Sequence, residues 1–215
     1  VTSLIEHSEP EQEDLRLKIA VVGKPNVGKS SITNALTGQN RSIVTDIPGT
    51  TRDAIDSIVK YYGEEIVLID TAGLRRKSKI SENIELYSVL RTSRAIERCD
   101  VAVVVLDAEK GLEDQDKKII NMVDDARKGM LIAVNKWDLI EKDTQTADKY
   151  VKAIYELIRT YDYVPIIFVS ALTKQRISKI IEYCKNINNL RKNRIPTSQL
   201  NKILLPIFER TPPPA

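Results

Sequence analysis

Apolar and polar positions follow two different rhythms along the chain. Continuous apolar runs, which are typical of strands buried on both faces, occupy residues 101–107, 130–135 and 165–170. Residues 15–23 form a further β-branched, apolar run that ends in glycine. Apolar residues at helical spacing follow these runs, at residues 29–38, 81–99, 113–128, 146–161 and 174–190. In residues 54–70, apolar and polar residues alternate on either side of YGEE, which predicts a hairpin with a tight turn.

This order of strands and helices predicts an α/β domain with three layers. We expect a mostly parallel six-stranded sheet with one antiparallel edge strand and helices on both faces. The first unit is a strand, a glycine loop and a helix closed by Gly38. After about Leu190 the sequence becomes basic and then proline-rich, and residues 196–208 combine an N-cap signal with apolar periodicity. This short predicted helix either packs on the main domain or begins another one.

The composition is that of an ordinary globular protein, with 42% hydrophobic and 29% charged residues among 215. Cys99 and Cys184 lie far apart without CxxC spacing, so the sequence indicates neither a zinc site nor a disulfide framework. No apolar run approaches the ~20 residues of a membrane span, and the first residues lack the pattern of a secretion signal. We therefore expect a cytoplasmic protein with reduced thiols and no membrane span.

The net charge of +3 is unevenly distributed along the chain. Residues 1–15 hold five acidic residues and no lysine or arginine, whereas residues 174–210 hold nine basic residues against two acidic ones. Two interpretations stay open. The ends are an acidic linker and a surface that faces nucleic acid, or they are solvated helix faces and a flexible tail.

The segment GKPNVGKS, Gly23 to Ser30, matches the pattern GxxxxGK[ST] between a predicted strand and a predicted helix. Gly23 and Gly28 allow the backbone to curl so that its amides point at phosphate oxygens, and the helix N-terminus adds its positive end. Lys29 is suited to pair with the β- and γ-phosphates of a nucleotide, and the Ser30 hydroxyl to bind Mg²⁺.

The segment NKWD separates guanine from adenine. Asn135, Lys136 and Asp138 follow a predicted strand, at the edge where open α/β sheets bind ligands. Asp138 can accept hydrogen bonds from the ring N–H and the amine of guanine, whereas adenine would leave its carboxylate unpaired, at a cost of ~1–3 kcal/mol or more. The segment SAL, Ser170 to Leu172, follows the next strand and can offer a backbone amide to the guanine oxygen.

Two further segments are candidates for contacts with the metal and the γ-phosphate. In DTAG, the Asp70 carboxylate can hold Mg²⁺ through a water, and the Gly73 amide can contact the γ-phosphate. The segment DIPGTTRD, residues 46–53, offers Thr50 and Thr51 as metal ligands, and we favour Thr51. By itself this second segment would be an ordinary Pro-Gly turn.

These segments occur in the order found in the translation-factor-related GTPases, over residues 17–172. The stretches PGTTRD, DTAGLRRKSK, YSVLRTSRAIERCDVAVVVLDAEKG and NKWD resemble the second G domain of the Der (EngA) double GTPases, which are bacterial ribosome-assembly factors. The stretch RIPTSQLNKILLPIFERTPPP is similar to the start of that family's C-terminal KH-like domain.

The resemblance implies a P-loop NTPase fold of the Ras-like G-domain type. It also implies an acidic linker at residues 1–15, a GTP-binding G domain at 16–190 and a truncated start of the KH-like domain at 191–215. A first G domain and the KH-like domain of the same polypeptide would then be partners of this chain. The chain departs from the family after SAL, where it has TKQRIS in place of a segment with one or two glycines.

The resemblance further implies the residues of a nucleotide site. Ser30, Thr51 and Asp70 would bind Mg²⁺, and Lys29, Thr51, Gly73 and Asn26 would take part in hydrolysis. GTP or GDP would be held by Gly23, Lys24, Pro25, Asn26, Val27, Gly28, Lys29, Ser30, Ser31, Asp70, Thr71, Ala72, Gly73, Leu74, Asn135, Lys136, Asp138, Ser170, Ala171 and Leu172.

Leu74 stands where many Ras-like GTPases have the glutamine that orients the attacking water. Three routes of water activation stay open: the γ-phosphate or a backbone group, a residue inserted by a partner, or a monovalent cation in the position of an arginine finger. In related GTPases with PNVGKS and an apolar residue after DTAG, the asparagine equivalent to Asn26 ligates K⁺. Alternatively, Asn26 merely favours the turn of its loop.

The basic segment LRRKSK follows DTAG, beside the expected γ-phosphate. It either docks on RNA or a neighbouring domain in one nucleotide state, or is a solvated loop. We expect GTP binding and Mg-dependent GTP hydrolysis, as a switch in assembly of the large (50S) ribosomal subunit, with that subunit or its RNA as partner. The alternative is a nucleotide-sensing module with negligible turnover that regulates RNA or domain docking. An ATPase would require Asp138 to tolerate adenine.

Overall fold

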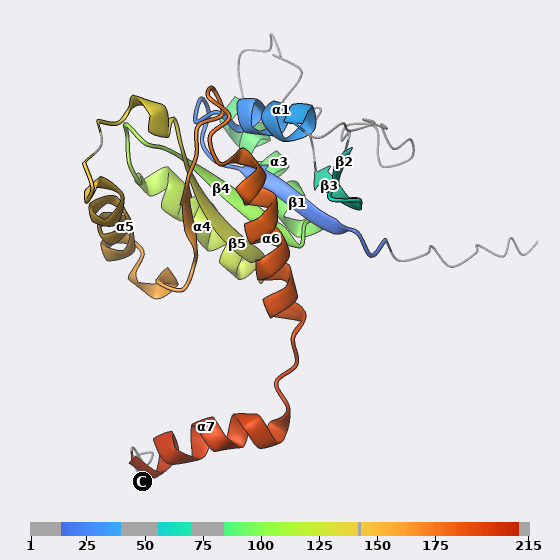
Figure 1. Ribbon diagram of the computed structural model, residues 1–215, viewed down its shortest axis with the longest axis vertical. Helices are drawn as coiled ribbons and strands as arrows, with labels where there is room; N and C mark the ends of the chain where they lie inside the picture. Colours follow the sequence, from blue (N-terminus) through green and yellow to red (C-terminus); the bar gives the residue numbers. More distant parts are fainter. Residues whose placement is uncertain (1–13, 40–55, 70–83, 142, 211–215) are drawn as a thin grey trace, which may run out of the picture.

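A single six-stranded sheet, in the order β2-β3-β1-β4-β5-β6, organises the protein (Figure 1). The computed structural model describes residues 14–39, 56–69, 84–141 and 143–210. Neighbouring strands are parallel except for the β2–β3 pair at one edge. The predicted fold class is therefore confirmed. The strands are β1 Leu17–Val22, β2 Ser57–Tyr61, β3 Glu64–Ile69, β4 Val101–Asp107, β5 Gly129–Asn135 and β6 Ile166–Phe168.

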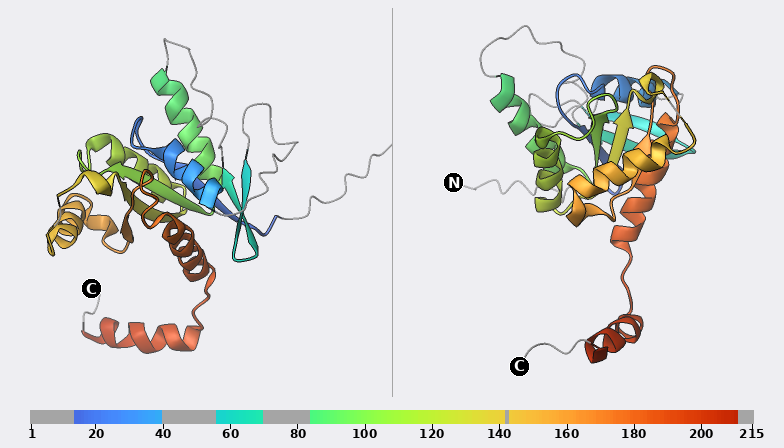
Figure 2. Two further views of the ribbon diagram at one scale, coloured as in Figure 1. Left: turned by 45° about the horizontal axis from the view of Figure 1, so that its top comes forward. Right: turned by 90° about the vertical axis from the view of Figure 1, so that its left-hand side faces the viewer.

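Helices cover both faces of the sheet, as Figures 1 and 2 show. One face packs against α3, α4 and α5, and the other against α1 and α6. Of the helices in the described ranges, none is long and apolar enough to cross a membrane. The helices are α1 Lys29–Gln39, α3 Ile84–Arg98, α4 Asp114–Asp125, α5 Thr146–Leu157, α6 Ile177–Lys192 and α7 Thr197–Arg210, and two single 3-10 turns occupy Trp137–Leu139 and Arg159–Tyr161.

Strands β4 and β5 explain why continuous apolar runs mark buried parallel strands. All seven residues of each strand are buried. Along β4, Ala102, Val104 and Leu106 face one helical layer, whereas Val101 and Val103 face the other. Because successive side chains of a strand point to opposite faces, a strand covered on both sides needs apolar residues at every position.

The hairpin of β2 and β3 turns through Tyr62 and Gly63, whose φ angles are 49° and 85°. A two-residue turn with both φ values positive matches the right-handed twist of the flanking strands. The predicted tight hairpin is confirmed.

Two predicted helix ends differ from the structure. Gly38 lies inside α1, which continues to Gln39, so glycine does not close this helix. The predicted helix at 146–161 divides at Ile158, whose φ of −125° and ψ of 45° are not helical. The Ile158 side chain is buried against the sheet, and the following residues form only a 3-10 turn.

Helix α7 stands apart from the sheet domain in both views of Figure 2. None of its residues is buried, so in the described part of the chain it does not pack on the main domain. Pro206 lies inside the helix, where its ring removes one backbone hydrogen bond. The large apolar side chains that α7 leaves exposed are Leu200, Ile203, Leu205, Ile207 and Phe208.

Candidate functional site

The phosphate-loop segment joins the end of β1 to the start of α1, as its sequence predicts. Gly23 has a φ of 148°, and a Cβ atom there would lie 2.6 Å from the Val105 carbonyl oxygen. Gly28 has a φ of 97°, and a Cβ atom would lie 2.2 Å from Nδ2 of Asn135. Both glycines are therefore required by backbone conformation and by close approach to the neighbouring strands.

Asn135 links three segments that are far apart in sequence. Its side chain is buried, and its Nδ2 donates to the Val27 carbonyl of the phosphate loop at 2.9 Å. Its Oδ1 accepts from the Ala171 amide of SAL at 3.0 Å. The segments GKPNVGKS, NKWD and SAL thus meet at the carboxyl edge of the sheet, where ligands bind in open α/β folds.

Lys29 is a half-buried cation at the first position of α1. Its Nζ donates to the Lys24 carbonyl at 2.5 Å, and no carboxylate pairs with it among the residues that the structure describes. Burial lowers the pKa of Lys29, because the charged form loses solvation. A loop with an unneutralised ammonium and a helix N-terminus attracts an anion.

Lys24 belongs to the same loop, yet its side chain points to α4. Its ammonium lies 2.7 Å from Oδ2 of Asp116 and also contacts the Glu113 carboxylate. Burial alone would lower the pKa of Lys24, but the hydrogen bonds that its ammonium donates to Asp116 and Glu113 outweigh burial and raise the pKa. Asp116 also accepts from the Glu113 amide at 2.9 Å, which caps α4. The loop is therefore tied to a neighbouring helix by an ion pair.

Lys136 has a left-handed backbone, with a φ of 63°, and extends over the loop that follows β4. Its Nζ lies 2.6 Å from Oδ2 of Asp107, a buried carboxylate that also accepts from the Glu109 amide at 3.0 Å. Burial would raise the pKa of Asp107, but the hydrogen bond from Lys136 and the Glu109 amide lower it. Asp107 therefore remains charged and fixes the Lys136 side chain.

Asp138 lies in the 3-10 turn after β5, which Trp137 anchors in the core. The Trp137 ring lies 4.1 Å from Phe168 and 5.4 Å from Tyr150 between ring centroids. Oδ1 of Asp138 is buried and has no hydrogen-bond partner within the described ranges. A buried carboxylate oxygen without a donor is costly, so this position favours a ligand that supplies N–H groups.

Hydrogen bonds with neighbouring residues stabilise the conformation of the SAL loop. Ser170 is fully buried and its hydroxyl accepts from the Thr173 amide at 3.0 Å. The Ala171 amide already donates to Asn135, so an amide for a guanine oxygen would have to come from another residue. The Leu172 side chain is exposed.

The segment TKQRIS keeps the conformation that glycines would favour. Lys174 and Arg176 have φ angles of 60° and 57°, and Arg176 is the residue immediately before α6. A left-handed conformation costs an L-residue other than glycine ~1–2 kcal/mol. The chain therefore adopts two left-handed residues in this segment without using glycine.

The remaining predicted positions of the loop are half-buried or exposed. Ser30 is half-buried at the second position of α1, whereas Pro25, Asn26 and Ser31 are exposed. Asn26 has a left-handed φ of 65°. Other predictions lie outside the described residues: Thr50 and Thr51, the segment Asp70 to Leu74 with Thr71, Ala72 and Gly73, and the basic residues Arg75, Arg76, Lys77 and Lys79.

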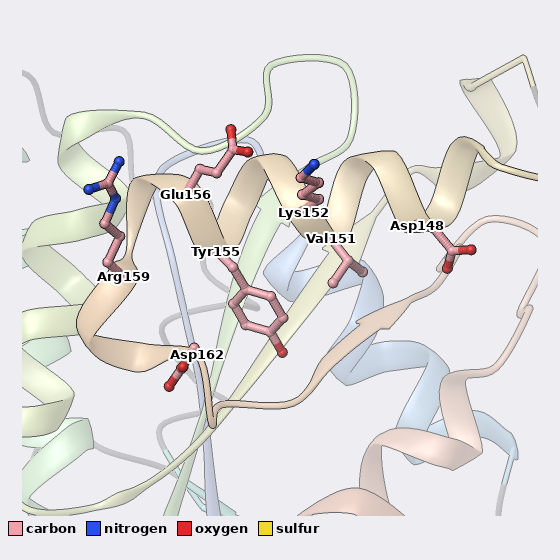
Figure 3. Close-up of a pocket in the computed structure, with 7 residues that line it drawn as sticks. All are labelled: Asp148, Val151, Lys152, Tyr155, Glu156, Arg159 and Asp162. Atoms are coloured by element: carbon pink, nitrogen blue, oxygen red, sulfur yellow. The ribbon is translucent and has the colours of Figure 1, made fainter.

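A separate groove of about 630 Å³ runs along α5 and contains none of the motif residues. Figure 3 shows Tyr155 and Val151 pointing toward the segment after the helix, whereas Lys152 and Glu156 point away from it. Tyr155 donates its hydroxyl to the Val164 carbonyl at 2.8 Å, which explains its position structurally.

Sequence reasoning missed three residues that shape this site. Asp107 ends an apolar strand, and the aspartate that ends VAVVVLD could have indicated a polar site at the carboxyl end of this strand. Glu113 and Asp116 open a helix that is distant in sequence from the phosphate loop, and no local pattern relates them to Lys24.

Comparison with known proteins agrees with this geometry. The family model described as 50S ribosome-binding GTPase matches residues 18–136. The chain is 56% identical over 213 residues to GTPase Der of Chloroherpeton thalassium, covering 99% of this chain and 49% of that protein. It is 53% identical over 203 residues to GTPase Der of Chloroflexus aggregans, covering 94% and 45%. The chain thus spans about half the length of the curated relatives it matches.

Solved structures show the same fold. Era in complex with MgGDPNP and a segment of 16S ribosomal RNA superposes with a TM-score of 0.58 and 27% identity, over 78% of this chain and 55% of that one. A probable GTP-binding protein, engB, superposes with a TM-score of 0.57 and 20% identity, over 80% and 98%. At that identity the second likeness concerns the fold alone.

Proposed function

Because this chain belongs to the family of 50S ribosome-binding GTPases, we propose that it binds GTP at the edge where GKPNVGKS, NKWD and SAL meet. One observation carries the proposal: the segments joined by Asn135 contain two unsatisfied groups in the described part of the chain. Asp138 has a buried carboxylate oxygen without a hydrogen-bond donor, and Lys29 has an ammonium group without a carboxylate partner. Guanine supplies two N–H groups to the first, and phosphates supply negative charge to the second.

In this proposal the phosphate-loop residues Gly23 to Ser31 surround the phosphates, and Lys29 neutralises the β- and γ-phosphates. Ser30 would hold Mg²⁺ together with Thr51 and Asp70. Its hydroxyl fits this role, because oxygen is the ligand that Mg²⁺ prefers and no described residue hydrogen-bonds to it. Mg²⁺ bound there would neutralise the charge that develops on the phosphates. Lys136 and Asp138 would recognise guanine, with Asn135 holding the loops in register.

We infer that the reaction is hydrolysis of GTP to GDP and phosphate. The decisive experiment measures phosphate release and nucleotide affinity with GTP and ATP, for the natural chain and for Asp138→Asn. The amide would present N–H groups to the N–H groups of guanine, so GTP affinity should fall by about tenfold or more. Leu139→Ala, an exposed neighbour in the same turn, is the matched control and should change affinity less than twofold. Equal turnover of GTP and ATP would refute the proposal.

Water activation is a separate part of the proposal. We propose that K⁺ bound near Asn26 assists hydrolysis, because Leu74 has no hydrogen-bonding group. The left-handed φ of 65° gives Asn26 an independent reason to be present. Asn26→Gly accepts that backbone conformation and removes the side chain with its amide group, so it separates the two roles. K⁺ should accelerate turnover over Na⁺ in the natural chain and not in Asn26→Gly; equal rates in both buffers would exclude the cation.

The biological role proposed is a switch in assembly of the large ribosomal subunit in the cytoplasm. Support comes from the family description and from relatives named GTPase Der. The subunit or its RNA would be the partner, together with further domains of the same polypeptide. The test compares binding of the GTP- and GDP-loaded chain to large subunits at two salt concentrations, with equal binding as the refuting result.

A second candidate function is a nucleotide-sensing module with negligible turnover that regulates RNA or domain docking. Leu74 favours it, since an apolar residue cannot orient water. Phosphate release in K⁺ buffer with and without large ribosomal subunits decides between the two, because a sensing module would release none in either condition.

The proposed domain division is a linker at 1–15, a G domain at 16–190 and the start of a KH-like domain at 191–215. Support comes from α7, which stands apart from the sheet in Figure 1. Its large apolar side chains are exposed. Limited proteolysis should cut between α6 and α7, at residues 193–196, before it cuts within the sheet domain.

A further inference from the structure

We propose that Lys24 is a positioning residue for the phosphate loop, held by its ion pair with Asp116 at the start of α4. The inference rests on the proposed nucleotide site. Lys24 would not touch the nucleotide with its side chain. It would act through its backbone carbonyl, which accepts the hydrogen bond from Lys29 at 2.5 Å.

The two ends of Lys24 make different contacts. Its side chain is only 7% exposed, and its ammonium lies 2.7 Å from Oδ2 of Asp116 with Glu113 as a second partner. Its carbonyl faces Lys29. The side chain therefore fixes the backbone position from which the Lys29 ammonium is held.

The loop is fixed at two points on either side of its exposed tip. Lys24 ties it to α4, and Val27 is tied to β5 through Asn135 at 2.9 Å. Pro25 and Asn26, between these points, are exposed. A loop whose ends are both fixed needs little rearrangement to surround a phosphate, which is the advantage of preorganisation.

Packing alone does not explain the pair. Asp116 is fully buried, and its Oδ1 has no hydrogen-bond partner in the described part of the chain. Removing two charges from water is expensive, and apolar residues of similar volume often stabilise a fold as well or better. Helix capping explains only part of the role of Asp116, because an asparagine at this position would also accept the hydrogen bond from the Glu113 amide.

The test is a double-mutant cycle with Lys24→Met, Asp116→Asn and the combination of both. Titration with fluorescently labelled GDP gives nucleotide affinity, and urea denaturation gives the free energy of unfolding. Lys24→Arg retains the charge. Val123→Ala is the control for stability: it truncates a buried apolar side chain on the same helix and should destabilise the fold without changing the loop. The double variant contains no buried unpaired charge at this position, since the remaining Glu113 side chain is 52% exposed, so it remains measurable if a single variant unfolds.

Lys24→Met and Asp116→Asn should each weaken GDP binding about tenfold, because a small displacement of the loop misplaces the phosphate contacts. The double variant should bind GDP no more weakly than either single variant, since both break the same pair. Lys24→Arg should stay within about threefold of the natural chain, and Val123→Ala should lose stability with GDP affinity unchanged.

The inference is overturned if the pair variants lose stability while GDP affinity stays within twofold of the natural chain, because the pair would then be structural only. It is also overturned if Val123→Ala weakens GDP binding as much as Lys24→Met. Failure of the natural chain itself to bind GDP would refute the proposed function instead, and the two failures are therefore distinguishable.

Discussion

Asn135 allows the most direct test of how the site is assembled. Its buried amide donates to the Val27 carbonyl at 2.9 Å and accepts from the Ala171 amide at 3.0 Å. Asn135→Ala would remove both hydrogen bonds at once. It would leave the Val27 carbonyl and the Ala171 N–H group without their partner.

The cost follows from the burial of the two groups. Val27 is buried, and its carbonyl would lose its partner at a cost of ~1–3 kcal/mol. Ala171 is half-buried, so water can partly replace the lost contact and the cost should lie near the lower end of that range. We therefore expect Asn135→Ala to reduce the free energy of unfolding by about 2–3 kcal/mol.

Asn135→Asp separates the two contacts. The carboxylate keeps the acceptor for Ala171 but directs a negative oxygen at the Val27 carbonyl. At neutral pH this variant should be at least as unstable as Asn135→Ala. Near pH 4 it should regain part of the loss, because a protonated carboxyl group can donate to Val27.

Urea denaturation at pH 7 and pH 4 measures these differences, with the slope m as a check that unfolding remains two-state. Asn189→Ala, an exposed asparagine on α6, is the control and should change stability by less than about 0.5 kcal/mol. A loss below 1 kcal/mol for Asn135→Ala, or an aspartate variant as stable as the natural chain at pH 7, would refute the reasoning.

Three further predictions follow from the site. Gly28→Ala should cost about 2 kcal/mol or more and weaken GDP binding, since its Cβ would lie 2.2 Å from Asn135 Nδ2 at a φ of 97°; unfolding and GDP titration measure both effects. Arg176→Gly should raise stability by about 0.5–1 kcal/mol, visible as a higher melting temperature, because the φ of 57° is strained for arginine. The depressed pKa of Asp107 predicts a stabilisation that is fully present above about pH 4 and lost as pH falls through the folded pKa, so Asp107→Asn should flatten the acid side of the stability curve.

The sheet could be predicted because its signals are local. The runs that became β4 and β5 are apolar up to their polar last residues, Asp107 and Asn135. The alternating residues of β2 and β3 are divided by a glycine turn. The position of the glycine loop between a strand and a helix could also be predicted from its sequence pattern. Gly23 and Gly28 adopt positive φ angles, which few other residues tolerate.

The ion pairs behind the site could not be predicted in the same way. Lys24 and Glu113 are 89 residues apart, and nothing in either segment indicates the other. The left-handed backbone conformation of Arg176 could not be predicted, because arginine has no preference for positive φ angles. The amphipathic pattern of α7 predicts a helix, but a pattern of apolar residues does not specify what covers them.

The parallel strands separate the phosphate loop, at their carboxyl edge, from the points at their amino edge where the chain enters β1 and leaves α6. Helix α6 returns to the amino edge, where the Arg191 guanidinium donates to the carbonyls of Asp100 and Arg127, just before β4 and β5 begin. The chain enters β1 at this edge as well, at Leu17. A strand of seven residues is about 20 Å long. The points where the chain enters β1 and leaves α6 therefore lie about a strand length from the phosphate loop, at the opposite edge of the sheet.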